Sequence, residues 1–543
     1  MVPVLIFTLI FSILSGYIFW GTWSPSIFPI MPDCGTMHPY GYWNALSEYF
    51  TSTCLNTFQF SPDNLMLLIG TPYFRQELQY VIYVYAAALG FAYFLRGRGL
   101  SNLASYGAAL LLSFAGYWFT LFSAGHLGWF QWMAYGVWAF GLTDRAVAGG
   151  KWKHYLLLAA VLAWGSRYQP DLWLLFSVFT FAYFVWCHFR EKCRPAWVKI
   201  VVAGLVFFAV GAPSFYHAIF TDLASRDKQI ENGETLSTST STSASENRWI
   251  FVTNWSLPPE DTLEFFWPRV HGDTSCPLTL SIGRQMKTGV TPYTGRLGRA
   301  KDAPSGNYRQ HSLYLGFITC ILAVIGLAGR ITKYELRITN DGRDVYFFAI
   351  AGFIFYLFAL GRFCEPIYRL VYMLPFGDYL RAPVKWYHLT EFAICVLAGY
   401  GIDYLQNLGA RYELRITNGG IFVLILMGAI NLAWVDKHYV APVDITTAYN
   451  RKMDMQMSVV STQQLKSPQL QSALREKYVI PMAYYLGNPD AVLVQVLKPR
   501  EDARRGLKST PVITAERMLG LISLLAGLFI IGFAVFPCLT TKR

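Results

Sequence analysis

Three acidic side chains in the first polar stretch of the chain could act as a general base. They are Asp33, Glu48 and Asp63, and His38 follows the first of them closely. A carboxylate there could accept a proton from an acceptor hydroxyl or hold a divalent cation. A structural role competes, because Asp33 lies in Pro-Asp-Cys-Gly, where an Asp side chain bonds its own backbone in a turn. The residue types alone fit both a catalytic role and a turn-forming role for Asp33.

Two later turns place charged or titratable side chains where apolar runs meet. His126 lies in "FSAGHLGWFQW", and Arg167 and Asp171 lie in "WGSRYQPDLW". An Arg at a membrane boundary could grip a phosphate, and an Asp could orient an acceptor or bind a metal ion. Alternatively, the Arg extends its charge to the membrane surface and the Asp caps a helix. Both interpretations stay open, although charges at a membrane boundary are often functional.

Two further segments combine cations with aromatic residues. They are "NWSLPPEDTLEFFWPRVHGD" (254–273) and "LPFGDYLRAPVKWYH" (374–388). Their candidate binding residues are Arg269, His271, Arg381 and Lys385. The cations of the second segment could bind a lipid phosphate or extend to the membrane surface beside aromatic rings. The aromatics of the first could cover a lipid groove or pack inside an outer domain.

The composition places these side chains in a membrane protein. Of 543 residues, 54% are hydrophobic and only 14% are charged, which is outside the usual balance of a soluble globular protein. The net charge of +12 comes from Lys and Arg scattered between apolar runs, so membrane topology explains it better than nucleic-acid binding. The sequence lacks the motifs for ATP hydrolysis, serine hydrolysis and structural zinc.

Apolar runs of about 20 residues predict about twelve membrane-spanning helices. The expected spans are residues 1–21, 78–95, 102–121, 127–143, 154–166, 171–189, 197–217, 313–329, 344–361, 387–406, 420–435 and 514–537. Short connections rich in Lys and Arg fall on one side, which the positive-inside rule makes cytoplasmic, together with both termini. The first run lacks a basic start and a small-residue cleavage site, so we interpret it as an anchor instead of a signal peptide.

Two long outer connections are polar enough to fold outside the bilayer, so we expect an all-α polytopic membrane protein with two larger extracytoplasmic insertions of mixed structure. The predicted parts are a membrane module 1–217 with outer loop 22–76, an outer domain 218–312, a second module 313–435, an outer segment 436–513 and a last helix with tail, 514–543. On the oxidising outer side Cys34 and Cys54 could form a disulfide, although four outer cysteines allow other pairings.

Five segments carry a resemblance to a known family. They are "SAGHLGWFQ", "RYQPDL", "LPPEDTLEFFWPRVHGD", "HSLYLGFITCILAVIGLAG" and, most specific, "LFALGRFCEPIYRLVYMLPFGDYLRAPVKWYHLTEFAICVLAGYGIDYL" at 357–405. In this order they resemble the YfhO-like bacterial multi-pass membrane proteins, within the GT-C class of lipid-dependent glycosyltransferases. The resemblance covers most of residues 1–406 and implies a GT-C-like helical bundle with a polyprenyl-phosphate-linked sugar as donor.

The resemblance also implies roles for the candidate residues. Asp33 matches the catalytic carboxylate after the first span, with Asp171 or Glu48 as a second acidic group. The cations expected to contact the donor phosphate are Arg167, Arg269, Arg381 and Lys385. We further expect His126 and His271 near the substrate. No cofactor is certain from the sequence, and a divalent metal ion is the candidate.

The sequence therefore predicts a glycosyltransferase in the cytoplasmic membrane of a bacterium. It would move a sugar from a polyprenyl phosphate to a glycan or protein acceptor of the cell envelope, at the outer face, among membrane lipids and without nucleic acid. A second hypothesis is a multi-pass transporter or flippase for a lipid-linked saccharide, which predicts a central polar cavity and similar halves. A third is a non-catalytic assembly protein.

Overall fold

The structure is a computed structural model of the chain. It describes residues 2–21, 27–29, 72–124, 127–166, 170–217, 248–250, 252–272, 312–331, 343–374, 377, 380–411, 418–440 and 442–444, with single positions between 518 and 530. The description below concerns these residues only.

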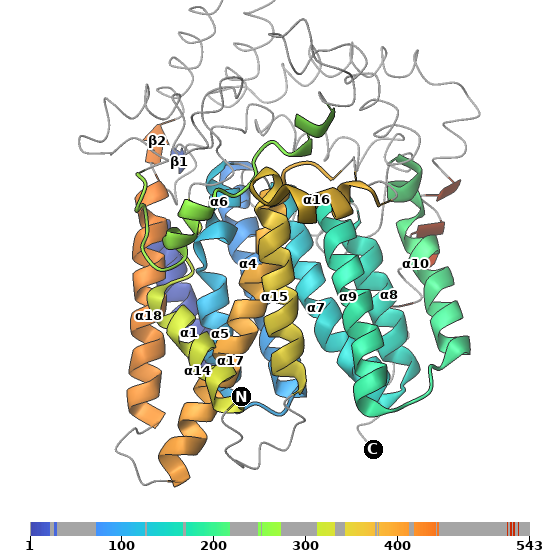
Figure 1. Cartoon of the computed structure of the whole chain (residues 1–543), viewed down its shortest axis with the longest axis horizontal. Coiled ribbons are helices and arrows are strands. Elements are labelled where there is room, and N and C mark those ends of the chain that lie inside the picture. Colours follow the sequence, from blue (N-terminus) through green and yellow to red (C-terminus); the bar gives the residue numbers. More distant parts are fainter. Residues whose placement is uncertain are drawn as a thin grey trace, which may run out of the picture.

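The described chain is a bundle of long helices (Figure 1). The long helices are α1 (Val2–Ile18), α4 (Pro72–Gly97), α5 (Asn102–Ser113), α6 (Gly116–Ala124), α7 (Leu127–Gly149), α8 (Trp152–Gly165), α9 (Pro170–Glu191), α10 (Trp197–His217), α14 (Phe317–Ile331), α15 (Arg343–Ala359), α17 (Tyr387–Arg411) and α18 (Asn418–Tyr439). Shorter elements are the 3₁₀-helices η4 (Pro259–Phe265), η7 (Gly361–Cys364) and η9 (Pro383–Trp386), the helix α16 (Glu365–Tyr372), and the strands β1 (Ile27–Pro29) and β2 (Pro442–Asp444).

Every expected span up to residue 435 overlaps one of these helices. In the described part, four helices are long and apolar enough to cross a membrane, and five if the bent pair α15 with η7 and α16 is one span. These apolar helices make the chain an all-α membrane protein by composition. The count of about twelve spans stays a prediction.

The expected span at 102–121 differs from the structure, because it is two helices with a break at Phe114 and Ala115. The Gly116 N–H donates to the Tyr314 carbonyl oxygen at 2.9 Å. A Cβ at Gly116 would lie 2.3 Å from the Ser312 hydroxyl, so only glycine allows this approach. The start of α6 is therefore held by a segment nearly 200 residues later in the chain, which no local pattern predicts. Likewise, α18 continues to Tyr439, four residues beyond the expected end of its span at 435.

The bundle has two ends, which we name by residues. At the Arg98 end, α4, α7 and α9 finish and α15 begins; at the Lys385 end lie η9, α16 and the two strands (Figure 1). There β1 pairs antiparallel with β2, with Phe28 opposite Val443. This pairing joins the expected first outer loop to the expected last outer segment, as a shared side of the membrane requires. At the same end the chain bends by 110° between α15 and the η7–α16 pair.

Side chains inside the bundle are mostly aromatic and small. An aromatic cluster lies where α4, α7, α9, α15 and α17 meet. Its ring centroids are 4.7–6.5 Å apart, and its members are Phe94, Phe140, Tyr183, Phe348 and Phe392. Large apolar side chains also point outward, and α10 is an example with Val201, Leu205 and Phe208 about two-thirds exposed. An outward apolar face on a long helix is what contact with lipid requires.

Candidate functional site

An ion pair between Asp171 and Lys385 lies at the Lys385 end. Asp171 is in the first turn of α9, which Pro170 starts with its preset φ angle, and Lys385 is in η9. Both side chains are nearly fully buried, with relative exposures of 6% and 4%. The Lys385 ammonium donates to Asp171 Oδ2, and the other carboxylate oxygen accepts from the Leu172 N–H at 2.9 Å. The sequence predicted both residues separately as site residues, and the fold brings them together.

A strained turn delivers Lys385 into the interior. Ala382, which precedes η9, has a φ of +66°, a conformation that L-residues with a Cβ rarely adopt. Two backbone hydrogen bonds to the 252–256 segment hold this turn, from Ala382 N–H to Val252 O and from Val384 N–H to Trp255 O, both 3.1 Å. Burial lowers the pKa of the Lys385 ammonium to about 7. The adjacent Asp171 carboxylate favours the charged form and opposes this effect.

Two arginines surround this turn. The Arg381 guanidinium lies over the Trp255 ring, 4.0 Å from its centroid. Arg362 of η7 donates to the Thr253 carbonyl oxygen at 2.9 and 3.1 Å and to Asn254 Oδ1 at 2.8 Å. With Lys385 they form a group of cations on the 361–364 and 381–386 segments, and both arginines contact the 252–256 segment. Arg381 was predicted from the sequence, whereas Arg362 was missed, although "GRFCEP" places it directly after an apolar run.

Arg269 and His271, also predicted, contact other parts of the chain. Arg269 Nη1 lies 2.9 Å from His438 Nε2 on α18. His271 Nε2 lies 3.1 Å from the backbone oxygen of Glu260 in η4. These contacts tie the 252–272 segment to α18 and to itself. They do not join Arg269 or His271 to the Asp171–Lys385 pair.

The remaining predicted site residues lie outside the described part. They are Asp33, Glu48, His126 and Arg167, and the cysteines of the possible disulfide, Cys34 and Cys54. Their convergence on the Lys385 end therefore stays a prediction.

A column of titratable side chains continues from Lys385 into the bundle. His388 and Glu391 follow at the spacing of successive helical turns, and both are 0% exposed. His388 stacks on the Tyr117 ring at 4.2 Å between centroids, and its Nδ1 lies 3.6 Å from Glu391 Oε2. His388 was missed from the sequence, although the spacing of Lys385, His388 and Glu391 in "KWYHLTE" could have indicated it.

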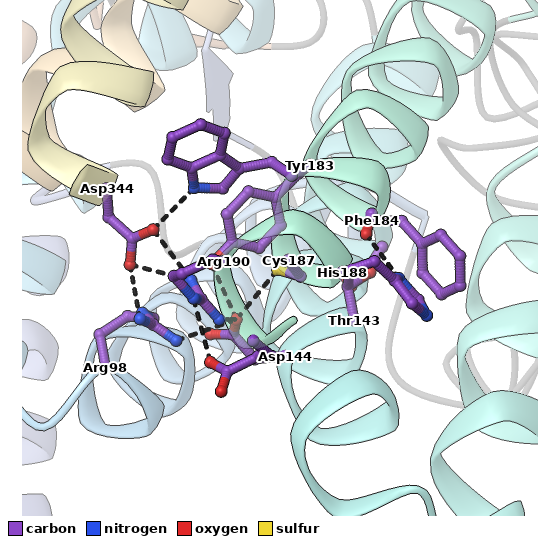
Figure 2. A network of polar contacts seen from close by, with 12 residues as sticks. Arg98, Thr143, Asp144, Tyr183, Phe184, Cys187, His188, Arg190 and Asp344 are labelled. Atoms are coloured by element: carbon purple, nitrogen blue, oxygen red, sulfur yellow. Dashed lines mark hydrogen bonds and ion pairs between the residues drawn. The ribbon is translucent and has the colours of Figure 1, made fainter. Parts of the chain in front are cut away.

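A second polar cluster, missed from the sequence, lies at the Arg98 end (Figure 2). Arg190 of α9 reaches both oxygens of Asp344 of α15, at 2.9 and 3.0 Å, and lies 3.3 Å from Asp144 Oδ1 of α7. Arg98, directly after α4, lies 2.6 Å from Asp344 and 3.3 Å from Asp144. Each residue lies in a stretch that we interpreted as a polar connection, so its burial was not expected.

Uncharged donors complete this Arg98–Asp144–Arg190–Asp344 cluster. The Tyr183 hydroxyl donates to Asp144 Oδ1 at 2.8 Å, and the Trp186 indole N–H donates to Asp344 Oδ1 at 2.8 Å (Figure 2). Two arginines balance two aspartates, and together they connect four segments of the bundle. Balanced charges leave no net charge for a ligand, and their ion pairs fix the geometry of the helix ends, so we interpret this cluster as structural.

The fold and these sites define a helical membrane protein with a buried ion pair at one end and a charge-balanced cluster at the other. No protein-family model matches the chain, and no curated protein matches it either.

Proposed function

We propose that the chain is a membrane glycosyltransferase of GT-C type. It would move a sugar from a polyprenyl-phosphate donor to a glycan or protein acceptor of the cell envelope. The observation that carries the proposal is the buried Asp171–Lys385 pair, with Arg381 and Arg362 beside it, at one end of an apolar bundle. The lipid chain of the donor would lie in the bilayer. Its phosphate would then lie at the membrane surface, next to the Lys385 end.

The proposed chemistry follows from the residue types. A carboxylate base takes the proton of the acceptor hydroxyl, the hydroxyl oxygen attacks the anomeric carbon, and the lipid phosphate leaves. Cations with little water around them stabilise the charge that develops on the leaving phosphate. Asp33 is the proposed base, while Lys385 and Arg381 are the proposed phosphate contacts. Asp171 then has a positioning role, because it holds Lys385 until the phosphate arrives.

The proposed topology has about twelve spans, with the Lys385 end outside and the Arg98 end in the cytoplasm of a bacterium. Apolar helices of membrane-spanning length and the β1–β2 pairing at the Lys385 end support it. The domain limits at 217, 312, 435 and 513 are part of the same proposal.

A transporter or flippase for a lipid-linked saccharide is the second candidate. One observation favours it: His388, Glu391 and Asp436 are ionisable side chains buried inside the bundle, at 0%, 0% and 1% exposure. Ionisable groups inside membrane proteins commonly mark ion or proton pathways.

The test is sugar transfer in vesicles supplied with a lipid-linked sugar. We expect Lys385→Met to reduce transfer by about a hundredfold, because one preorganised contact to developing charge is worth about that much. We expect Asp33→Asn to reduce it by at least about a hundredfold, as for a general base. Glu365→Gln is the matched control, since Glu365 is in an exposed i,i+4 pair with Arg369.

The outcomes separate the hypotheses. Full transfer by Asp33→Asn would remove Asp33 as the base, and full transfer by Lys385→Met would remove the site at this end. Movement of the lipid-linked sugar across the vesicle membrane without transfer would favour the flippase.

A further inference from the structure

Among the described residues, two buried acids in the Lys385 half of the bundle have no ion pair with a Lys or Arg side chain. Asp171 is matched by Lys385, but Glu391 of α17 and Asp436 of α18 are buried as well, at 0% and 1% exposure. The ammonium of Lys437, next to Asp436 in sequence, donates instead to the Ile18 and Trp20 carbonyl oxygens after α1, at 2.9 and 2.7 Å. Two ionised carboxylates without a compensating charge are too costly to bury.

Asp436 is the more isolated of the two acids. Among the described residues, neither of its carboxylate oxygens has a hydrogen-bond partner. Glu391 has His388 Nδ1 at 3.6 Å, and the backbone N–H of Tyr117, in the first turn of α6, approaches its carboxylate. Glu391 and Asp436 interact electrostatically with each other, so they share one buried region between α17 and α18. We call them the interior acid pair.

The groups next to the interior acid pair come from three elements. The titratable residues that interact with it are Tyr80 of α4, Tyr117 of α6, and Tyr387, His388 and Cys395 of α17. Tyr80 interacts with both acids. Cys320 of α14 interacts with Cys395 and Tyr387, and Lys385 of η9 interacts with His388 and is already paired with Asp171.

The described residues contain no group of three or more His, Cys, Asp and Glu side chains arranged to hold a metal ion. A pair of acids flanked by a histidine is, by contrast, enough to hold a proton. We propose that the interior acid pair is a proton-binding site, connected to the Lys385 end through His388. The proton bonds to one oxygen of the pair, which removes one negative charge from the interior.

The geometry also gives a route for exchange. His388 lies between Lys385 and Glu391 along η9 and the first turns of α17. A proton that arrives from the Lys385 end first converts the His388 imidazole to the imidazolium. Its Nδ1–H bond then breaks, the electron pair stays on Nδ1, and an O–H bond forms on Glu391 Oε2 at the 3.6 Å approach, which leaves the imidazole neutral again. This site does not require sugar transfer and goes beyond the proposed function.

Infrared difference spectroscopy of the purified full chain in lipid nanodiscs tests the proposal directly. A protonated carboxylic acid has a C=O stretch that an ionised carboxylate lacks, and the band shifts when the proton exchanges for deuterium. At neutral pH we expect this band in the wild type, a deuterium shift on transfer to heavy water, and loss of the band in Glu391→Gln or Asp436→Asn. His388→Phe, which keeps a ring to stack on Tyr117, should keep the band and slow its deuterium shift.

Glu365→Gln is the control, because its exposed carboxylate is ionised at neutral pH and its removal should leave the band unchanged. If the acid variants do not fold, wild-type protein made with carboxyl-labelled glutamate or aspartate gives the same assignment, since only the labelled acid shifts its band. The absence of a band from these acids would overturn the proposal. A band that never exchanges would overturn it as well, since the proton would then be only structural. Loss of the band when sodium replaces choline would assign the site to a metal cation instead.

Discussion

Lys385 of η9 and Asp171 of α9 form a buried ion pair between residues separated by 214 positions in sequence. The pair closes one end of an apolar bundle, and the strained Ala382 turn and the 252–256 segment hold it there. The same contact therefore links the stability of this end to its proposed phosphate chemistry.

Removing the carboxylate of this pair should destabilise the protein in a pH-dependent way. Asp171→Asn leaves Lys385 buried without its counter-ion, at a cost of about 3–5 kcal/mol. Burial lowers the Lys385 pKa to about 7 with Asp171 present, and the pKa falls further when Asp171 no longer opposes the effect of burial. Below pH 7 the unfolded chain then binds more protons than the folded variant, so the variant should gain stability relative to wild type as pH rises to about 7, measured as thermal unfolding in detergent.

The double variant Asp171→Asn with Lys385→Met is the control for that measurement. It removes both charges and should recover most of the lost stability and lose the pH dependence. An Asp171→Asn variant with an unchanged unfolding profile would contradict the buried pair.

Breaking the cluster at the Arg98 end should cost more than breaking a surface pair. Asp344→Asn leaves Arg98 and Arg190 facing one remaining aspartate, and we expect a loss of about 3–5 kcal/mol in unfolding free energy. Glu191→Gln removes a partner of the same Arg190 that is 39% exposed, and should cost at most about 1 kcal/mol. If both variants lowered the thermal unfolding temperature equally, burial would not determine how much each ion pair contributes to stability.

Close packing of α14 against α17 depends on glycine. A Cβ at Gly401 would lie 1.9 Å from the Leu322 carbonyl oxygen, so Gly401→Ala forces the helices apart, at about 1–3 kcal/mol. Gly204 on α10 has no neighbour within 4 Å of a Cβ, so Gly204→Ala should be neutral or stabilising by up to about 1 kcal/mol. Thermal unfolding of the two variants side by side checks the contrast, and the reverse order would refute the packing.

The end of α9 offers a stabilising change. Lys192 follows the helix with a φ of +49°, the left-handed conformation that glycine adopts without a Cβ penalty. We expect Lys192→Gly to raise the unfolding free energy by about 0.5–1 kcal/mol. Lys192→Ala removes the same charge without relieving the backbone, so it should show no such gain.

The sequence alone predicted which stretches are helical, though not the break between α5 and α6, because a helix in lipid must satisfy its backbone within one apolar run of about 20 residues. It also identified Asp171, Arg381 and Lys385 as charges at the ends of such runs. Only the tertiary structure decided their partners. Asp171 meets Lys385 and Arg98 meets Asp344 across long stretches of chain, and nothing in the residues between them encodes the contact.

The same distinction explains the break in the 102–121 range, which depends on Tyr314 and Ser312. The charged residues at the Arg98 end are of the kind that usually indicates an exposed loop. In the fold they form a buried cluster, because the ends of several helices converge there and exclude water from all of them. Hydrophobicity is a property of a segment, so the sequence reveals it directly. The compensation of a buried charge is a property of the neighbours that the fold supplies, so only the assembled bundle reveals it.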